Sequence, residues 1–155
     1  MCLNFKPILL SMTVMLVAVA LRAQSLGMRV LYTARTRHLD FEQAPLAATR
    51  VDLDQGLALA DVVSLHTPLT AETRHLMDAR RLGLMKPTAI LVNTARGPVI
   101  DEQALVDALV GHRIYAAGVD VFEQEPKVHP GLMSLDNVVA VAAAAKGSTF
   151  LLILG

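Results

Sequence analysis

Short apolar segments alternate with helix-like segments through most of the chain. From Gly27 onward the pattern predicts strands at residues 28–33, 61–66, 89–93, 116–122 and, as the last one, 138–141. It predicts helices at residues 55–60, 78–84 and 101–110, a turn or short helix at 70–72, and only a weakly periodic segment at 46–53. Asp101 is the expected N-cap of the third helix. Strands separated by helices of this length predict βαβ units, and therefore an α/β fold with a doubly wound parallel sheet.

The first part of the chain has a different pattern. Lys6 precedes an uncharged stretch, residues 7–21, which is followed by Arg22 and the small residue Ala23. A basic start, an apolar core and a small residue form the pattern of a signal peptide. An Ala/Val-rich helix packed on a sheet, next to a buried strand remnant, explains the same residues. We favour the helix because an α/β domain follows without a break, and we expect no membrane span, which takes about 20 apolar residues.

Composition narrows the class of protein. Hydrophobic residues make up 54% of the 155 residues, which suits one domain, residues 1–155, with a sheet covered on both faces. Lys and Arg number 14, as do Asp and Glu, so nothing in the charge favours nucleic acid or an anionic membrane as a partner. The single cysteine, Cys2, excludes an internal disulfide and suits a reducing cytoplasm. No cluster of His, Cys, Asp and Glu has metal-ligand spacing, so no metal is expected.

Two apolar runs end in polar side chains that can carry chemistry. Residues 91–97 end in Arg96 and Gly97, and residues 119–126 contain Asp120 and Glu125. The carboxyl ends of parallel strands meet at one edge of a sheet, where ligands bind in open α/β folds. A guanidinium can hold a carboxylate in bidentate fashion, and a carboxylate can tune a neighbouring proton donor. Arg96 and Glu125 are therefore the candidate catalytic residues.

Several segments, taken together and in order, resemble the NAD(P)-binding domain of the D-isomer-specific 2-hydroxyacid dehydrogenases, especially the glyoxylate/hydroxypyruvate reductase branch. The resemblance covers about residues 17–139 and rests on residues 26–32, 60–63, 66–70, 72–74, 93–97 and 118–126. It implies a Rossmann-like fold and reduction of small 2-keto acids, such as glyoxylate or hydroxypyruvate, by hydride transfer from NAD(P)H. It also implies a homodimer.

The resemblance also assigns roles to individual residues. Arg96 would bind the substrate carboxylate and polarise its keto oxygen. Glu125 would hydrogen-bond the catalytic histidine and raise its pKa. Asp120 would face the nicotinamide carboxamide. Four further residues would line the cofactor cleft: Thr67, Pro68, Thr94 and Ala95. If the resemblance is set aside, a solvated loop arginine explains Arg96 as well as a substrate-binding role does. A surface turn before Pro126 likewise explains Glu125.

The segment after strand 28–33 bears on the choice of cofactor. A carboxylate at this position would accept hydrogen bonds from the ribose 2′-hydroxyl and specify NAD. This chain has Arg35, Thr36 and Arg37 there, and no acidic residue among them. Two arginines beside a hydroxyl suit the 2′-phosphate of NADP, so NADP is the expected cofactor, with NAD possible and an exposed basic turn as the alternative.

The sequence departs from the family in three respects. The glycines of the dinucleotide-binding loop would fall on Ser11, Thr13 and Leu16, and none of these is glycine. The catalytic histidine would fall near Ala143, but residues 140–155 contain no histidine, and His129 is the only other donor nearby. The third departure is size, because neither part of the family's substrate domain is expected in this chain. The apolar tail, residues 150–154, does not match the family and resembles the product of a truncation or a frame change.

Three interpretations of function follow. The first is an oxidoreductase that retains Arg96 and Glu125. The second is a catalytically inactive remnant that binds nucleotide or only dimerises. The third is a secreted or membrane-tethered protein, which rests on residues 7–21 alone. Without a complete first strand–loop–helix unit, the sheet is expected to lose its central strand or to fill that position with a poorer one.

Overall fold

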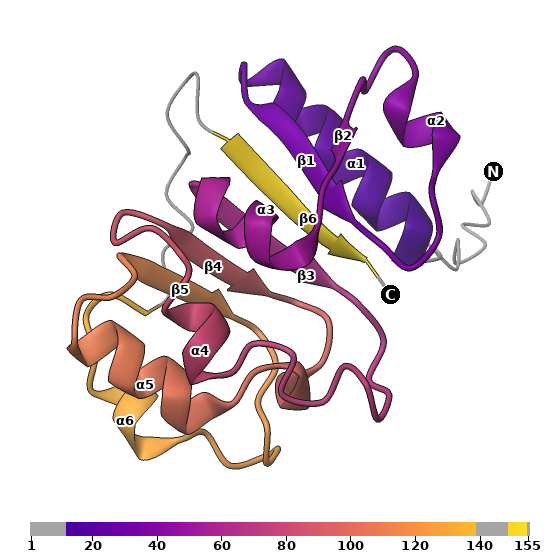
Figure 1. Ribbon diagram of the computed structural model, residues 1–155. Coiled ribbons are helices and arrows are strands. Elements are labelled where there is room, and N and C mark those ends of the chain that lie inside the picture. Colours follow the sequence, from indigo (N-terminus) through magenta and orange to yellow (C-terminus); the bar gives the residue numbers. More distant parts are fainter. Residues whose placement is uncertain (1–11, 139–148, 155) are drawn as a thin grey trace, which may run out of the picture.

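A six-stranded parallel sheet forms the framework of the protein. The computed structural model describes residues 12–138 and 149–154. Every neighbouring pair of strands is parallel (Figure 1). From one edge to the other the strands are β2 (Thr49–Arg50), β1 (Arg29–Thr33), β6 (Thr149–Leu154), β3 (Val62–His66), β4 (Ile90–Asn93) and β5 (Ala116–Val119). The predicted α/β doubly wound fold is confirmed.

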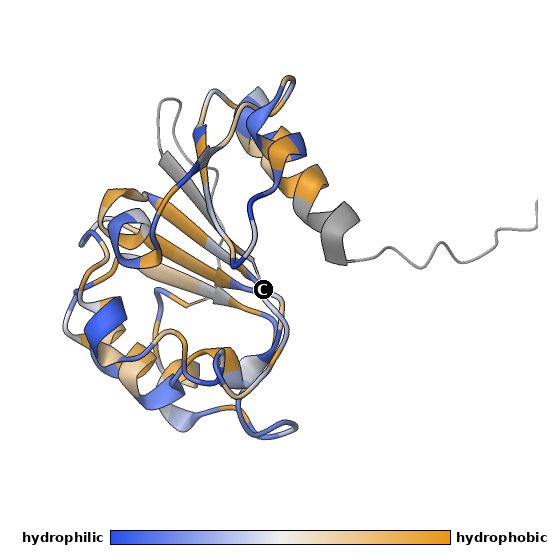
Figure 2. Cartoon of the chain, turned by 45° about the vertical axis from the view of Figure 1, so that its right-hand side comes forward, coloured by the Kyte–Doolittle hydropathy of each residue, from blue (hydrophilic) through white to orange (hydrophobic). Residues whose placement is uncertain are grey.

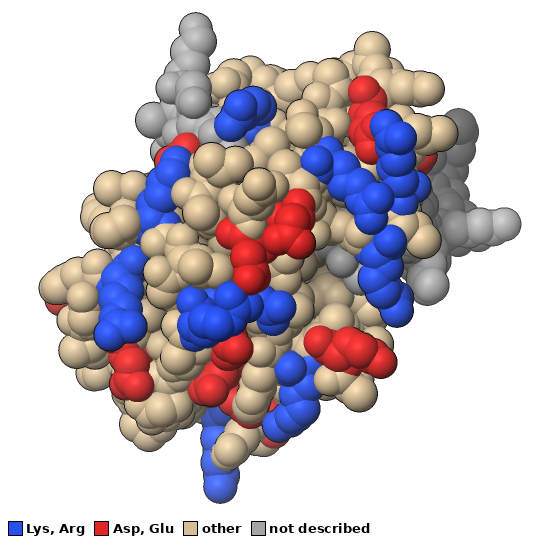
Figure 3. Space-filling view, in the orientation of Figure 1, with Lys and Arg blue, Asp and Glu red and all other residues tan. Residues whose placement is uncertain are grey.

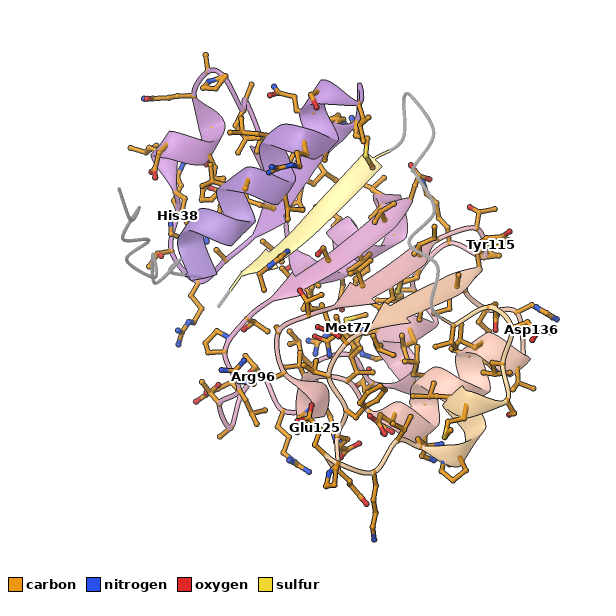
Figure 4. All side chains as sticks on the ribbon, turned by 180° about the vertical axis from the view of Figure 1, so that it is seen from behind. His38, Met77, Arg96, Tyr115, Glu125 and Asp136 are labelled. Carbon is orange, nitrogen blue, oxygen red and sulfur yellow. The ribbon has the colours of Figure 1, made fainter. Side chains whose placement is uncertain are left out.

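Helices cover this sheet from both sides. They are α1 (Met12–Ser25), α2 (Leu39–Glu42), α3 (Leu53–Leu59), α4 (Ala79–Leu82), α5 (Glu102–Val110) and α6 (Pro130–Met133), with a 3-10 turn η1 at Gly97–Val99. Figures 1 and 4 show α1 on one face of the sheet and α3, α4 and α5 on the other. Asp101 caps α5 as predicted, because its carboxylate accepts a hydrogen bond from the backbone N–H of Ala104 at 3.0 Å.

The apolar residues divide into two cores, one on each face of the sheet. On β1, Val30 and Tyr32 belong to the core beneath α1, whereas Leu31 belongs to the larger core beneath α3 and α5. Alternation of this kind follows from the two-residue period of a strand. Figure 2 shows the hydrophobic colour concentrated in the strands and on the inner sides of the helices. Both faces are therefore buried around β1, as expected for a doubly wound sheet.

The central position of the sheet is taken by β6, the last strand that the structure describes. Leu151 of β6 pairs with Leu31 of β1 on one side and with Val63 of β3 on the other. In the strand order typical of dinucleotide-binding folds, this position belongs to the first strand of the chain. The apolar tail that matches no family pattern thus fills the position that was expected to be empty or poorly filled.

The last strand that the structure describes is β6, so the prediction that residues 138–141 form the last strand was wrong in its order. Val138 forms only an isolated bridge with Ala117, residues 139–141 lie outside the described part, and β6 follows later. An apolar run alone does not indicate which run follows as the next strand, and this is why β6 was not predicted.

The N-terminal stretch forms the expected helix over residues 12–25. Ala20 and Ala23 of α1 are buried against Met28 and Val30, which belong to the same core. The helix interpretation is therefore confirmed for this part, while residues 7–11 lie outside the described residues. Among the helices that the structure describes, none is long and apolar enough to cross a membrane.

Candidate cofactor and active site

A pocket of about 270 Å³ lies where the carboxyl ends of β1, β6 and β3 meet. Arg35 and the residues before it line one side, the Thr67–Pro68 turn lines another, and Ile153 of β6 lies between them. This is the switch point of the sheet, where helices on its two faces leave in opposite directions and ligands bind. Three of the predicted cofactor residues, Arg35, Thr67 and Pro68, are thus brought together although more than 30 positions separate Arg35 from Thr67.

The Thr67–Pro68 side of the pocket is held by a network of threonines. Thr73 Oγ1 donates to the carbonyl of Pro68 at 2.6 Å, and the backbone N–H of Thr70 donates to Thr73 Oγ1 at 2.7 Å. Thr70 Oγ1 in turn donates to Glu72 Oε2 at 2.7 Å. That bond, with a smaller contribution from the charge of Arg35, holds the pKa of Glu72 below its usual value. Glu72 is a pocket residue that was not predicted from the sequence.

Arg37 and Thr36 are not placed in this pocket. Arg37 lines a separate groove of about 820 Å³ beside the ends of β1 and β2, and Thr36 is exposed and lines neither cavity. The Arg37 guanidinium binds the Glu42 carboxylate: Nε donates to Oε2 at 2.9 Å, and Nη2 donates to the same oxygen at 2.5 Å. Tyr32 also donates to Glu42, at 2.7 Å. The hydrogen bonds from Arg37 and then from Tyr32 lower the pKa of Glu42 to about 2, so the pair is fully ionised at neutral pH.

Arg96 lies on a loop organised by Asn93. Asn93 is buried at the end of β4; its Nδ2 donates to the carbonyl of Arg96 at 3.0 Å, and its Oδ1 accepts from the N–H of Ala95 at 3.1 Å. Arg96 Nη1 donates to the carbonyl of Ala95 at 2.7 Å. Ala95 is buried, whereas Thr94 and Arg96 are exposed. Asn93 orients this loop, a role that was not predicted from the sequence although the residue ends the predicted strand.

Asp120 and Glu125 follow the neighbouring strand β5. The backbone N–H of Asp120 donates to the carbonyl of Asn93 at 3.0 Å, which holds the two loops side by side. Glu125 Oε1 accepts from the backbone N–H of Phe122 at 3.1 Å, and the side chains of both acids are exposed. Figure 4 shows Arg96 and Glu125 at the same edge of the sheet, beyond the carboxyl ends of the strands. Within the described residues, no hydrogen bond or ion pair joins the two side chains.

Two histidines lie near this edge, and their roles differ. His129 caps α6, because its Nδ1 accepts from the backbone N–H of Gly131 at 3.2 Å, which commits that ring nitrogen. His75 Nε2 lies 2.7 Å from Glu123 Oε1, and both residues line the same cavity of about 560 Å³. No sequence pattern indicates this pair, because 48 positions separate the two residues. The position near Ala143, where the family's histidine was sought, lies outside the described residues.

A third histidine ends β3, directly before the Thr67–Pro68 turn. His66 Nε2 lies 2.8 Å from Ser64 Oγ, two residues back on the same face of the strand. Burial lowers the pKa of His66, because the interior disfavours the charged imidazolium. The imidazole of His66 is therefore neutral at pH 7.

Comparison with known proteins identifies the family. Residues 11–144 match the model of the D-isomer-specific 2-hydroxyacid dehydrogenase NAD-binding domain, which is most of the chain. The chain belongs to the D-isomer-specific 2-hydroxyacid dehydrogenase family. The matched residues end before β6, so the central strand of the sheet lies outside the family match.

Individual relatives agree with this assignment. A glyoxylate reductase from Thermococcus onnurineus is 54% identical over 122 residues, which are 79% of this chain and 36% of that protein. The NADPH-dependent glyoxylate/hydroxypyruvate reductase of Sinorhizobium meliloti, solved with NADP and malonate, has a TM-score of 0.70 at 33% identity, over 79% of this chain and 37% of the other. A D-lactate dehydrogenase from Lactobacillus jensenii, solved with NAD+, has a TM-score of 0.71 at 33% identity, over 79% of this chain and 40% of the other. This 2-hydroxyacid dehydrogenase family chain thus spans little more than a third of the length of its relatives.

Proposed function

We propose that this chain is the NAD(P)-binding domain of an oxidoreductase that acts on the CH–OH group of D-2-hydroxy acids, and that it prefers NADP(H) to NAD(H). The observation that carries the proposal is the pocket that joins Arg35 to the Thr67–Pro68 turn at the switch point of the sheet. Relatives solved with either dinucleotide support the class of cofactor. Glyoxylate and hydroxypyruvate are the proposed substrates, because reductases of these acids are among its relatives.

The donor set at this edge of the sheet fits a dinucleotide. Among the described residues, the guanidinium of Arg35 makes no hydrogen bond, so its donors are available to a ribose or phosphate oxygen. Figure 1 shows α1 beginning beside the carboxyl end of β6, so the N-terminus of a 14-residue helix points toward the same edge. Such a terminus favours the negative charge of a pyrophosphate. Thr13 and Leu16 lie inside this helix where the family has glycines, and we expect them to weaken pyrophosphate binding.

The chemistry of the site is divided between the cofactor and this chain. The bound nicotinamide supplies the hydride. Arg96 would hold the substrate carboxylate in bidentate fashion and polarise the neighbouring keto oxygen. Asp120 would orient the nicotinamide carboxamide. Glu125 occupies the position that, in the family, stabilises the imidazolium of the catalytic histidine, but residues 140–155 of this chain contain no histidine to donate that proton. Thr94 and Ala95 would line the cleft between them.

A second candidate function is a catalytically inactive domain that binds nucleotide or dimerises. Residues 140–155 contain no histidine, and His129 is engaged as the cap of α6. Loss of a general acid typically reduces the rate by about 10²–10⁴-fold. An inactive domain that binds nucleotide shares the enzyme's prediction for cofactor binding, whereas one that only dimerises predicts no binding. Both forms of the inactive domain predict no turnover. We infer a cytoplasmic protein and a homodimer in either case, from the family and from the single cysteine.

A fluorescence titration of the purified chain with NADPH and with NADH tests the proposal. Saturable binding that is tighter for NADPH supports it, and Arg35→Gln should reduce that preference. Arg113→Gln, at an exposed arginine beyond α5, is the matched control and should leave both affinities unchanged. Turnover of glyoxylate or hydroxypyruvate would then favour the enzyme over the inactive domain. If the chain binds neither dinucleotide, the proposed function is wrong.

A further inference from the structure

Arg50 holds the turn that carries Arg35. It ends the two-residue strand β2 and lies opposite Tyr32 of β1 in the sheet register. Arg50 Nη2 donates to the carbonyl of Ala34 at 2.9 Å and to the carbonyl of Arg35 at 3.2 Å. One nitrogen of the guanidinium thus fixes both peptide groups at the point where the chain leaves β1.

The rest of the Arg50 guanidinium remains available to a ligand. A guanidinium has five N–H donors, and within the described part of the chain Nε and Nη1 of Arg50 make no hydrogen bond. Arg50 lines the 820 Å³ groove, and its charge helps to lower the pKa of Glu42 there. A cation with unused donors therefore faces the groove.

The other charged groups of this groove are already committed to each other or to the backbone. Glu42 is held by Arg37 and by Tyr32. Asp52 caps α3, because its carboxylate accepts from the N–H of Asp54 at 3.0 Å. No carboxylate among the described residues lies within ion-pair distance of Arg50. On the face of the molecule drawn in Figure 3, Lys and Arg side chains gather on the right, with acidic side chains among them.

We propose that Arg50, together with Arg35, binds the 2′-phosphate of a 2′-phosphorylated adenine nucleotide, so that Arg50 determines the preference for NADP(H). This inference rests on the proposed function and assigns its selectivity to a residue outside the Arg35–Arg37 turn. A phosphate dianion beside the turn would receive charge-assisted hydrogen bonds from the free donors of Arg50 and from Arg35. A ribose 2′-hydroxyl carries no charge and gains little from the same guanidinium.

Calorimetric titration with adenosine 2′,5′-bisphosphate and with AMP tests this inference directly. These probes differ by the 2′-phosphate and do not require the pyrophosphate or nicotinamide sites. The wild-type chain should prefer the bisphosphate. Arg50→Gln should weaken bisphosphate binding about tenfold and AMP binding less than about twofold, as expected for loss of a charge-assisted contact. Arg50→Lys keeps the charge but not the planar fork, and should give an intermediate loss.

The outcomes separate this inference from the proposed function. Arg113→Gln is the control for removal of an exposed arginine and should behave as the wild type. Equal weakening of both probes by Arg50→Gln would mean that Arg50 only supports the turn, and would overturn the inference, as would a wild-type chain without preference. If the chain binds the bisphosphate with the expected Arg50 dependence but binds neither dinucleotide, the 2′-phosphate site is supported, whereas the proposed function and the role of Arg50 in dinucleotide preference both fail. Should Arg50→Gln not fold, as judged by circular dichroism, Arg50→Lys decides between the same outcomes.

Discussion

Gly97 lies directly against the backbone of Phe122. A β-carbon added to Gly97 would overlap the carbonyl group of Phe122 and would come within 2.6 Å of the backbone nitrogen of Glu123. No side chain fits in this space. The loop that carries Arg96 and the loop that carries Glu125 are therefore held in one relative position by a contact between two backbones.

We expect Gly97→Ala to destabilise the fold by about 1–3 kcal/mol or more, the usual cost of forcing atoms into a closely packed site. Urea unfolding followed by circular dichroism measures this. The matched control is Gly83→Ala, because a β-carbon at Gly83 would meet the nearest backbone oxygens at 3.3 Å, a contact that needs only a small adjustment. Equal unfolding free energies for the two variants would show that the contact at Gly97 is not tight in solution.

Ile153→Ala tests the place of β6 in the sheet. Ile153 is 2% exposed, and it belongs to the core beneath α3 and α5. Truncation of a buried isoleucine to alanine typically lowers the free energy of unfolding by about 2–5 kcal/mol. Met133, which is 76% exposed, provides the control Met133→Ala, with an expected change within about 0.5 kcal/mol. A loss below about 1 kcal/mol for Ile153→Ala would contradict a central β6.

Glu42→Gln should make the stability of the protein less sensitive to acid. The pKa of Glu42 is lowered to about 2 in the folded state, mainly by Arg37, from an ordinary value of 4.5. Its ionised form therefore stabilises the fold above about pH 4.5, and this contribution disappears as the pH falls through about 2. Thermal unfolding midpoints between pH 6 and pH 2 should fall less steeply for Glu42→Gln than for the wild type. Arg37→Gln removes the other partner and should flatten the profile in the same way; an unchanged slope in both variants would exclude the ion pair as the cause.

Protonation of His66 should also lower the free energy of unfolding as the pH falls, but at a higher pH than protonation of Glu42. Burial holds its pKa below the ordinary 6.5, so the unfolded state binds a proton more readily than the folded state. Stability is complete above about pH 6.5 and is lost as the pH falls through the lowered pKa. The difference in unfolding free energy between wild type and His66→Gln should shrink from pH 7.5 toward pH 5. An imidazole proton titration by NMR with a midpoint above 6.5 would show that the ring is not desolvated.

Much of the fold was predictable because it is specified locally. The strands β1, β3, β4 and β5 are apolar runs between helix-like segments, and Asp101 stands where an N-cap belongs. The position of β6 was not predictable in this way. An apolar run shows that a segment prefers burial, whereas its place in the sheet depends on which edges the other strands leave unpaired.

The site divides in the same manner. Arg35, Thr67 and Pro68 follow the ends of predicted strands, so their meeting at one edge follows from the topology of a parallel sheet. The commitment of Arg37 to Glu42 depends on a short helix, α2, that returns the carboxylate to Tyr32. The role of Arg50 depends on a two-residue strand that shows almost no pattern. These side chains are positioned by tertiary packing, and their roles are visible only in three dimensions.

The place of β6 also constrains how the chain is made. β1 and β3 emerge from the ribosome before residues 149–154. Until β6 emerges, the edge of each strand that β6 will pair with is exposed. Among the described strands, only β6 pairs with both halves of the sheet, β2–β1 and β3–β4–β5. Exposed inner edges of this kind are templates for pairing with other chains. The nascent chain is thus most prone to aggregation before β6 emerges and pairs with β1 and β3.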